Sequence, residues 1–275
     1  MKFSEEGMIN FISFLIIYIF LLSYFSPNLI FSKTTTSGGD TPSHHYIAYY
    51  LKDYLLPKFR ITGWSQDWYA GFPFLTFYFP LTYLLIDFLS FLIDFVISFK
   101  IVTILGIFLL PLSSFICMKS LEFKFPIPII SSILSLLFLF SESYTFYGGN
   151  IPSTLAGEFS YSLSLSIMLI LTGFLYKGVN KNRYLIKNPI LFSLMSFSHL
   201  YTTSVFFFSS FSLLIKRAIS RIKYLFLFYF IGFSLIAFWL LPFIFYHSYA
   251  SSLGWIQDKN LKNLYLQPFN FTLIF

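Results

Sequence analysis

Seven long stretches with almost no charged residues dominate the sequence. They are Met8–Ser26, Phe72–Phe99, Ile101–Met118, Ile127–Ser141, Phe159–Tyr176, Pro189–Ile215 and Tyr224–Tyr246. The hydrocarbon core of a membrane, about 30 Å thick, is crossed by a helix of roughly 20 apolar residues. Only 11% of the 275 residues are charged, against about 25% in a soluble domain, which is too few to give a globule a wetted surface. We therefore expect an all-α, polytopic transmembrane helical bundle.

The basic residues occur in three short clusters between these stretches. The clusters are Lys119 with Lys124; Lys177, Lys181, Arg183 and Lys187; and Lys216, Arg217, Arg221 and Lys223. This placement is typical of cytoplasmic membrane loops, so we attribute the net charge of +7 to membrane orientation and expect no nucleic-acid partner. The single Cys117 excludes an internal disulfide and a thiolate metal cluster. We expect an integral protein of the cell (inner) membrane.

The basic clusters also predict how the chain crosses the membrane. If all three are cytoplasmic, Pro189–Ile215 begins and ends on the same side, so it forms a tight helical hairpin with its outer tip at residues 198–202. By the same reasoning Phe72–Phe99, which contains a proline and two aspartates, is re-entrant or lies in the outer half of the membrane. The competing arrangement makes both stretches single spans and places the last basic cluster outside.

Residues 1–275 are predicted to form a single membrane domain. The first arrangement gives about seven spans, a cytoplasmic N-terminus and three outer segments, at about residues 31–100, 142–158 and 247–275. The sequence ends in an apolar stretch at residues 270–275. We therefore expect an incomplete chain, or a core module that lacks a soluble C-terminal domain.

In the first outer segment, two glycines, Gly38 and Gly39, are followed by Asp40. The glycines allow a tight backbone approach, and the Thr-Pro pair after Asp40 is typical of the start of a helix. Apolar residues then recur at helical spacing, which predicts an amphipathic helix over residues 42–56 lying in the membrane interface. Asp40 either caps this helix, where a carboxylate is favoured, or takes part in chemistry.

Two histidines follow Asp40. His44 stands four residues after it, so both side chains can face one site if the turn stays helical. His45 is adjacent to His44 and points in another direction, which argues against a two-histidine metal site. The sequence has no HExxH or HxxEH pattern of a zinc protease. We predict a catalytic role for Asp40 and substrate-binding roles for His44 and His45.

An arginine and several aromatic residues lie further along the first outer segment. The candidate substrate-binding residues among them are Arg60, Trp64, Asp67 and Trp68. One interpretation is an aromatic belt at the membrane interface. The other is a binding platform, in which Arg60 pairs with a phosphate and the rings stack on sugar faces.

Glu158 closes the second outer segment, at the membrane edge of the next apolar stretch. An ionisable group at that depth is costly without a partner or a task. Glu158 either stands at a helix N-terminus for structural reasons or meets Asp40 across the bundle, where the two carboxylates hold a divalent metal. Oxygen ligands suit Mg²⁺ or Mn²⁺, which would clamp a phosphate leaving group. His199, at the predicted hairpin tip, is a weaker substrate-binding candidate.

This arrangement resembles the GT-C superfamily of membrane glycosyltransferases. Their catalytic Asp lies in the first outer loop beside interface-lying helices, and Asp40 matches that position. The sequence Leu-Ala-Gly-Glu-Phe-Ser at residues 155–160 resembles the second acidic motif of oligosaccharyltransferase catalytic subunits. The resemblance implies an inverting transfer of a sugar from a polyprenyl-phosphate donor, a membrane lipid, on the outer membrane face.

Residues 38–166 look closer still to a family of prokaryotic membrane proteins labelled 6-pyruvoyl-tetrahydropterin synthase-related. That label implies no activity here, because the soluble synthase has a three-histidine zinc site whose spacing this sequence lacks. The chain departs from the GT-C pattern in being short and in having no DxD in its second outer segment. Two rival functions stay open: a lipid or solute transporter or flippase, for which Asp87 and Asp94 are the candidates, and a non-catalytic membrane scaffold.

Overall fold

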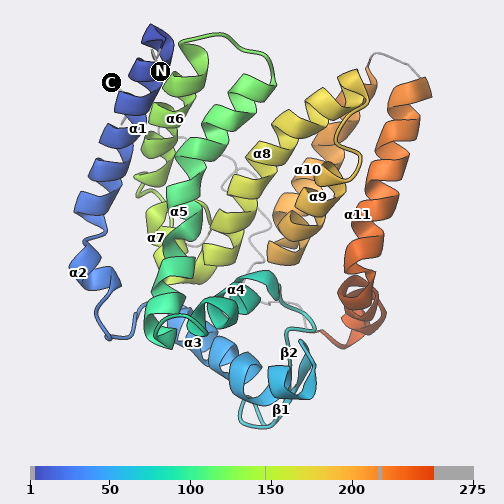
Figure 1. Ribbon diagram of the computed structural model, residues 1–275. Coiled ribbons are helices and arrows are strands. Elements are labelled where there is room, and N and C mark those ends of the chain that lie inside the picture. The colour runs from blue at the N-terminus through green and yellow to red at the C-terminus, as the bar shows by residue number, and fades with distance from the viewer. Residues whose placement is uncertain (1–3, 146, 216–218, 251–275) are drawn as a thin grey trace.

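The computed structural model describes residues 4–145, 147–215 and 219–250, and almost all of its regular structure is helical (Figure 1). The helices are α1 Glu5–Tyr24, α2 Pro27–Ile30, α3 Thr41–Tyr50, α4 Leu81–Ser90, α5 Phe95–Ser120, α6 Ile127–Leu139, α7 Ile151–Ser153, α8 Phe159–Lys181, α9 Lys187–Ser198, α10 Leu200–Ser210 and α11 Ile219–Tyr246. Two short antiparallel strands, β1 Gly63–Ser65 and β2 Phe72–Phe74, pair Gly63 with Phe74. The predicted helical bundle is confirmed.

Four helical segments are long and apolar enough to cross a membrane. They are Glu5–Tyr24, Phe95–Ser120, Ile151–Lys181 and Ile219–Tyr249. The other predicted crossings contain α6, α9 and α10, which have 13, 12 and 11 residues and are shorter than the roughly 20 residues that span a bilayer. The protein is therefore a polytopic helical membrane protein, and the number of seven spans stays a prediction.

Helices α5 and α8 pack along each other at the centre of the bundle (Figure 1). Gly106 of α5 lies directly against the backbone of Ser162, where a β-carbon would overlap it. The Ser166 hydroxyl donates to the Gly106 carbonyl at 2.9 Å. Small residues let helices approach closely in membranes, and hydroxyls then bond across the interface. This contact fixes the position of the start of α8, which carries Glu158.

Residues 189–215 form the predicted helical hairpin. Helix α9 ends at Ser198, His199 has an extended backbone with φ −162°, and α10 starts at Leu200. The rings of Phe192 and Phe206, on either side of this break, have centroids 6.3 Å apart, so the two helices run back along each other. The tip of the hairpin is at His199, within the predicted turn.

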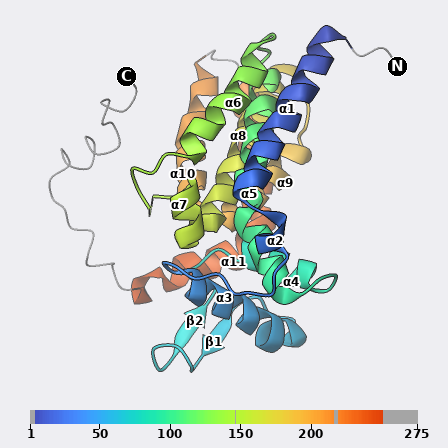
Figure 2. The same cartoon turned by 90° about the vertical axis from the view of Figure 1, so that its left-hand side faces the viewer.

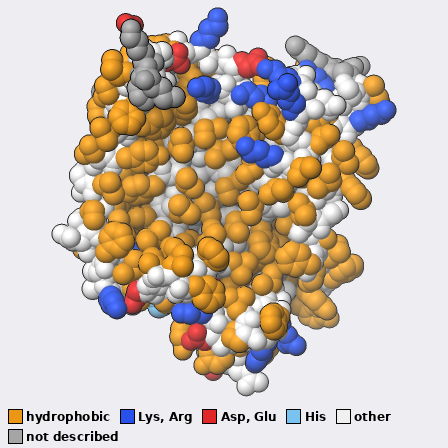
Figure 3. All heavy atoms as spheres, viewed as in Figure 1, with side chains coloured by type: hydrophobic (Ala, Val, Ile, Leu, Met, Phe, Trp, Pro, Cys, Tyr) orange, Lys and Arg blue, Asp and Glu red, His pale blue; other side chains and the backbone are white. Residues whose placement is uncertain are grey.

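The three basic clusters lie at one end of the bundle. Lys181 donates to Glu122 at 2.5 Å, Arg221 donates to Asn180 at 2.5 Å, and the Tyr224 hydroxyl donates to the Arg183 carbonyl at 2.7 Å. Figure 3 shows Lys and Arg side chains at this end and also at the opposite end, with a broad band of apolar side chains between them. The clusters before and after the hairpin thus lie at the same end of the bundle, as the hairpin topology requires. Residues 216–218 of the last cluster lie outside the described part.

The stretch Phe72–Phe99 is divided into three elements. It contains β2, the ten-residue α4 and the start of α5, so it is not a single crossing helix. Figures 1 and 2 show α3, the two strands and α4 gathered across the end of the bundle opposite the basic clusters. This end holds the first outer segment and the predicted site residues.

The predicted interface helix is present, but its apolar stripe contacts protein. Helix α3 continues through a π-helical turn at Leu51–Leu55. Ala48, Leu51 and Leu55 are buried in one cluster with residues of α4 and α5, whereas Tyr54, which the helical spacing also placed on the stripe, is 48% exposed. Residues of α4 thus supply apolar contacts to this face, and the expectation that the helix lies in the membrane interface stays a prediction.

Candidate functional site

The start of α3 is bound directly to the turn that precedes α8. The Asp40 amide donates to the Ala156 carbonyl at 2.7 Å, and the Thr41 hydroxyl donates to the Leu155 carbonyl at 2.8 Å. Gly39, with φ +51°, lies so close to Ala156 that a β-carbon would overlap its carbonyl. A side chain at this position would push the two segments apart. Gly39 therefore allows the two outer segments to approach each other closely.

Gly157 brings the two predicted carboxylates together. Its φ is +134°, and a β-carbon there would lie 3.1 Å from the Asp40 β-carbon and 3.1 Å from His44 Nε2. Glu158 follows at once, and its charge and that of Asp40 repel each other. The structure thus gathers Asp40, His44 and Glu158 around one glycine.

Neither carboxylate is used to cap its helix. Asp40 occupies the N-cap position of α3 and Glu158 that of α8, yet neither side chain accepts a capping hydrogen bond. Asn150, by contrast, caps α7, where its side chain accepts from the Ser153 amide at 3.0 Å. Neither side chain therefore makes a hydrogen-bonded cap, while both stand where the helix dipole favours a negative charge. Asp40 is exposed and Glu158 is partly buried.

His44 is held in a pocket of aromatic rings beside Asp40. Its Nδ1 lies 2.6 Å from the Tyr83 hydroxyl, and its ring contacts Tyr78 and Phe159. Burial lowers the pKa of His44 to about 4, against the attraction of the Asp40 charge. The imidazole is therefore neutral at physiological pH, so it offers a ligand a hydrogen bond and not a positive charge.

The other two histidines have different surroundings. His45 packs its ring against Phe95 and Phe99, each with centroids 5.1 Å away, so it points away from His44 as predicted. His199 lies against Phe79, at 4.5 Å, and Tyr161, at 5.1 Å. Its Nδ1 is buried and has no hydrogen-bond partner within the described residues.

The remaining predicted residues form a separate aromatic cluster around the two strands. Trp68 stacks on Tyr46 with centroids 5.7 Å apart, and the Tyr46 hydroxyl donates to Asp67 at 3.1 Å. Asp67, which from the sequence had no structural task, thus has a partner. Trp64 is 62% exposed and Arg60 is exposed. In the described parts of the chain, no hydrogen bond or ion pair joins these residues to Asp40 or Glu158.

A comparison with protein families matches residues 75–268 to the 6-pyruvoyl-tetrahydropterin synthase related domain, a family of membrane proteins. The chain belongs to this family. No curated protein and no solved structure matches the chain. The matched residues of the synthase-related domain include Glu158 and His199 and begin after Asp40 and His44, so the candidate site combines a residue of the family region with residues that precede it.

Sequence reasoning missed the residues that support this site. Tyr78 and Tyr83 flank Pro80 and surround His44. Burial raises the pKa of Tyr78, and the nearby charges of Glu158 and Asp40 raise it further. Tyrosine hydroxyls within an apolar stretch are a usable signal, because a buried hydroxyl normally needs a partner.

The described residues contain no group of three or more His, Cys, Asp or Glu side chains placed to hold a metal ion. Asp40 and Glu158 are the two carboxylates of the candidate site, and each influences the other electrostatically. This donor set fits the usual protein contribution to a Mg²⁺ site, which is one or two carboxylates completed by water and substrate phosphate. It does not fit a closed zinc site, which takes four protein ligands.

Proposed function

We propose that this protein is a GT-C-type glycosyltransferase that transfers a sugar from a polyprenyl-phosphate donor to an acceptor hydroxyl on the outer membrane face. The observation that supports this proposal most is the pair of carboxylates, Asp40 and Glu158, which stand together at two helix starts and cap neither. Like charges brought together without structural use raise the energy of the fold, so a task for them is expected.

The position of the pair suits a lipid-linked donor. The carboxylates stand at the starts of α3 and α8, at the end of the bundle opposite the three basic clusters (Figure 1). Basic clusters favour the cytoplasmic side, which puts the carboxylates on the outer side. The phosphate of a polyprenyl lipid lies at the same level, because its chain is confined to the bilayer.

In the proposed chemistry Asp40 acts as general base and as metal ligand, and each of the other groups has one role. Asp40, the more exposed carboxylate, accepts the proton of the acceptor hydroxyl while that oxygen bonds to the anomeric carbon. The bond from this carbon to the donor phosphate breaks, and the phosphate leaves with the electron pair. Neutral His44 donates a hydrogen bond to the donor. A divalent cation bound by Asp40 and Glu158 would neutralise charge on the leaving phosphate.

The test is transfer of radiolabelled sugar from polyprenyl-phosphate sugar in membranes that contain the protein, with added Mn²⁺ or with a chelator. Asp40→Asn and Glu158→Gln should each abolish transfer, and the double variant should be no worse than the weaker single one, because the groups act as a unit. Asp53→Asn, an exposed carboxylate on the helix that follows α3, is the control and should transfer normally. Wild-type transfer by Asp40→Asn would overturn the proposal. Substrate flux in proteoliposomes without transfer would instead favour a transporter.

A further inference from the structure

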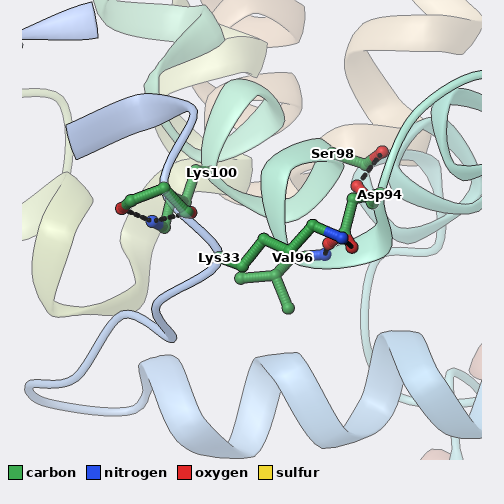
Figure 4. Close-up of polar contacts among 6 residues, drawn as sticks. Lys33, Asp94, Val96, Ser98 and Lys100 are labelled. Atoms are coloured by element: carbon green, nitrogen blue, oxygen red, sulfur yellow. Dashed lines mark hydrogen bonds and ion pairs between the residues drawn. The ribbon is translucent and has the colours of Figure 1, made fainter. Parts of the chain in front are cut away.

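Lys100, in the second turn of α5, is a buried cation bound by uncharged groups. Only 7% of it is exposed. Its ammonium donates to the carbonyls of Leu29 and Ser32, at 2.9 and 2.7 Å. It also donates to the hydroxyls of Ser32 and Thr34, at 3.0 and 3.1 Å. These bonds tie the loop after α2 to α5 (Figure 4), but they bring no negative charge.

Lys33, in the loop after α2, differs from Lys100 both in its exposure and in its partner. Lys33 is 76% exposed and forms an ion pair with Asp94 at 3.2 Å (Figure 4). No carboxylate in the described parts of the chain forms an ion pair with Lys100. An exposed lysine needs no counterion, whereas a buried one is costly unless an anion compensates its charge. Asp94 pairs with the exposed Lys33. The anion that compensates the charge of the buried Lys100 is therefore expected to come from a ligand.

A cavity of about 230 Å³ opens beside Lys100. Its lining includes three threonines, Thr34, Thr35 and Thr36. The Thr36 hydroxyl is buried and has no hydrogen-bond partner within the described chain, so it is available to a ligand. The cavity lining also includes the apolar residues Phe25, which follows α1, Ile30 of α2 and Ile104 of α5.

We propose that this cavity binds the phosphate group of an anionic lipid. The threonine hydroxyls would bind the phosphate, and the apolar lining residues would receive the first part of its hydrocarbon chain. The positive charge of Lys100 would attract the phosphate while its N–H groups stay bonded to the chain. Leu155 also lines the cavity, while its carbonyl accepts the hydrogen bond from Thr41, so the cavity borders the Asp40 site. The lipid is either a bulk anionic phospholipid or a polyprenyl phosphate, and the site does not depend on the proposed glycosyl transfer.

The test measures lipid binding by the whole protein in nanodiscs of phosphatidylcholine. The added probes are phosphatidylglycerol, polyprenyl phosphate, polyprenol without phosphate, and inorganic phosphate. Thermal unfolding and native mass spectrometry report whether each probe stabilises the protein and stays bound. We expect one or both phosphate-bearing anionic lipids to bind and polyprenol not to bind. The lipid that binds more tightly identifies the source of the phosphate.

Single substitutions test which residues bind the lipid. Lys100→Met should weaken lipid binding at least about tenfold, which is about 1.4 kcal/mol, and the matched Lys33→Met should leave binding unchanged. Thr36→Val removes only the hydroxyl without a partner, so it keeps the fold and should weaken binding severalfold even if Lys100→Met does not fold. Equal binding by wild type and Thr36→Val, equal binding of polyprenol, or equal binding of inorganic phosphate would each overturn the proposal.

Discussion

Two aspartates of the first outer segment precede helices, and their surroundings differ completely. Asp94, at the start of α5, accepts a hydrogen bond from the Val96 amide at 2.9 Å and pairs with Lys33 at 3.2 Å (Figure 4). Asp40, at the start of α3, contributes its backbone to the fold, while its carboxylate makes no capping bond. An aspartate before a helix is thus a structural residue in one case and an available carboxylate in the other.

The difference comes from what surrounds each helix start. Asp94 lies next to a loop that brings a lysine to it, so its charge is compensated locally. Asp40 instead lies beside Gly157 and faces a second carboxylate, Glu158. A residue whose polar atoms are satisfied within the chain contributes stability, and one whose atoms are left available is suited to a ligand.

Replacing each aspartate by asparagine gives the largest expected contrast. Asp40→Asn should lower sugar transfer by at least about 100-fold, the usual contribution of a general base, and leave thermal stability nearly unchanged. Asp94→Asn should keep transfer at the wild-type level. Transfer in membranes and thermal unfolding of the purified variants measure both properties. Equal loss of transfer in the two variants would show that Asp40 and Asp94 do not differ in function.

Gly157→Ala tests the close packing of Gly157 against Asp40 and His44, which has no counterpart at Asp94. Its φ of +134° disfavours any residue with a β-carbon, at a cost of about 1–3 kcal/mol, and the new methyl group would press on Asp40 and His44. We expect a lower unfolding temperature together with a loss of most transfer activity. Gly38→Ala is the control, because a β-carbon there meets no atom within 4 Å, although its φ of +118° carries a backbone cost of its own. Full transfer by Gly157→Ala would contradict the assigned geometry.

The sequence was sufficient for features that depend on neighbouring residues. The clustering of Lys and Arg predicted that residues 189–215 return to the end where they start, and the hairpin tip lies at His199. Helical spacing likewise predicted the helix over residues 42–56. Charge in short loops and periodicity in short windows are local properties, so one sequence contains enough information for them.

Features that depend on packing between distant segments could not be predicted. The partner of His44 is Tyr83, 39 residues away, and the partner of Thr41 is Leu155, 114 residues away. The burial of the α3 stripe against α4 and the hydrogen bond from Tyr46 to Asp67 also required the folded chain. Apolar length alone did not give the number of spans, because several apolar stretches contain short or broken helices.

The pH dependence of the free energy of unfolding gives a second way to compare the surroundings of Asp40 and Asp94. The pKa of His44 falls from about 6.5 to about 4 on folding, so the unfolded chain binds more protons between these values. Stability should therefore decline as the pH falls from about 6.5 toward 4, by about 1–2 kcal/mol for this residue between pH 7 and pH 5. His44→Gln should weaken this decline in thermal unfolding measured across the range.

The same experiment distinguishes Asp40 from Asp94. The Asp40 charge opposes the fall in the His44 pKa, so Asp40→Asn should steepen the acid-side loss of stability. Asp94→Asn should not alter the His44 contribution. Identical acid profiles for wild type and His44→Gln would show that His44 is not buried in its neutral form.

The smallest expected effect concerns the two structural roles of Asp94. Asp94→Ala removes both the cap and the ion pair, and should lower the unfolding temperature by a few degrees. Lys33→Met removes only the ion pair, which in water contributes little, and should have a barely measurable effect. The hydrogen bond from Lys33 lowers the pKa of Asp94 below its usual value, so this small contribution is present above about pH 4 and is lost in more acidic solution. Transfer should stay normal in both variants. If Asp94→Ala kept its stability and lost transfer, Asp94 would share the role proposed for Asp40, and the distinction between the two helix starts would be wrong.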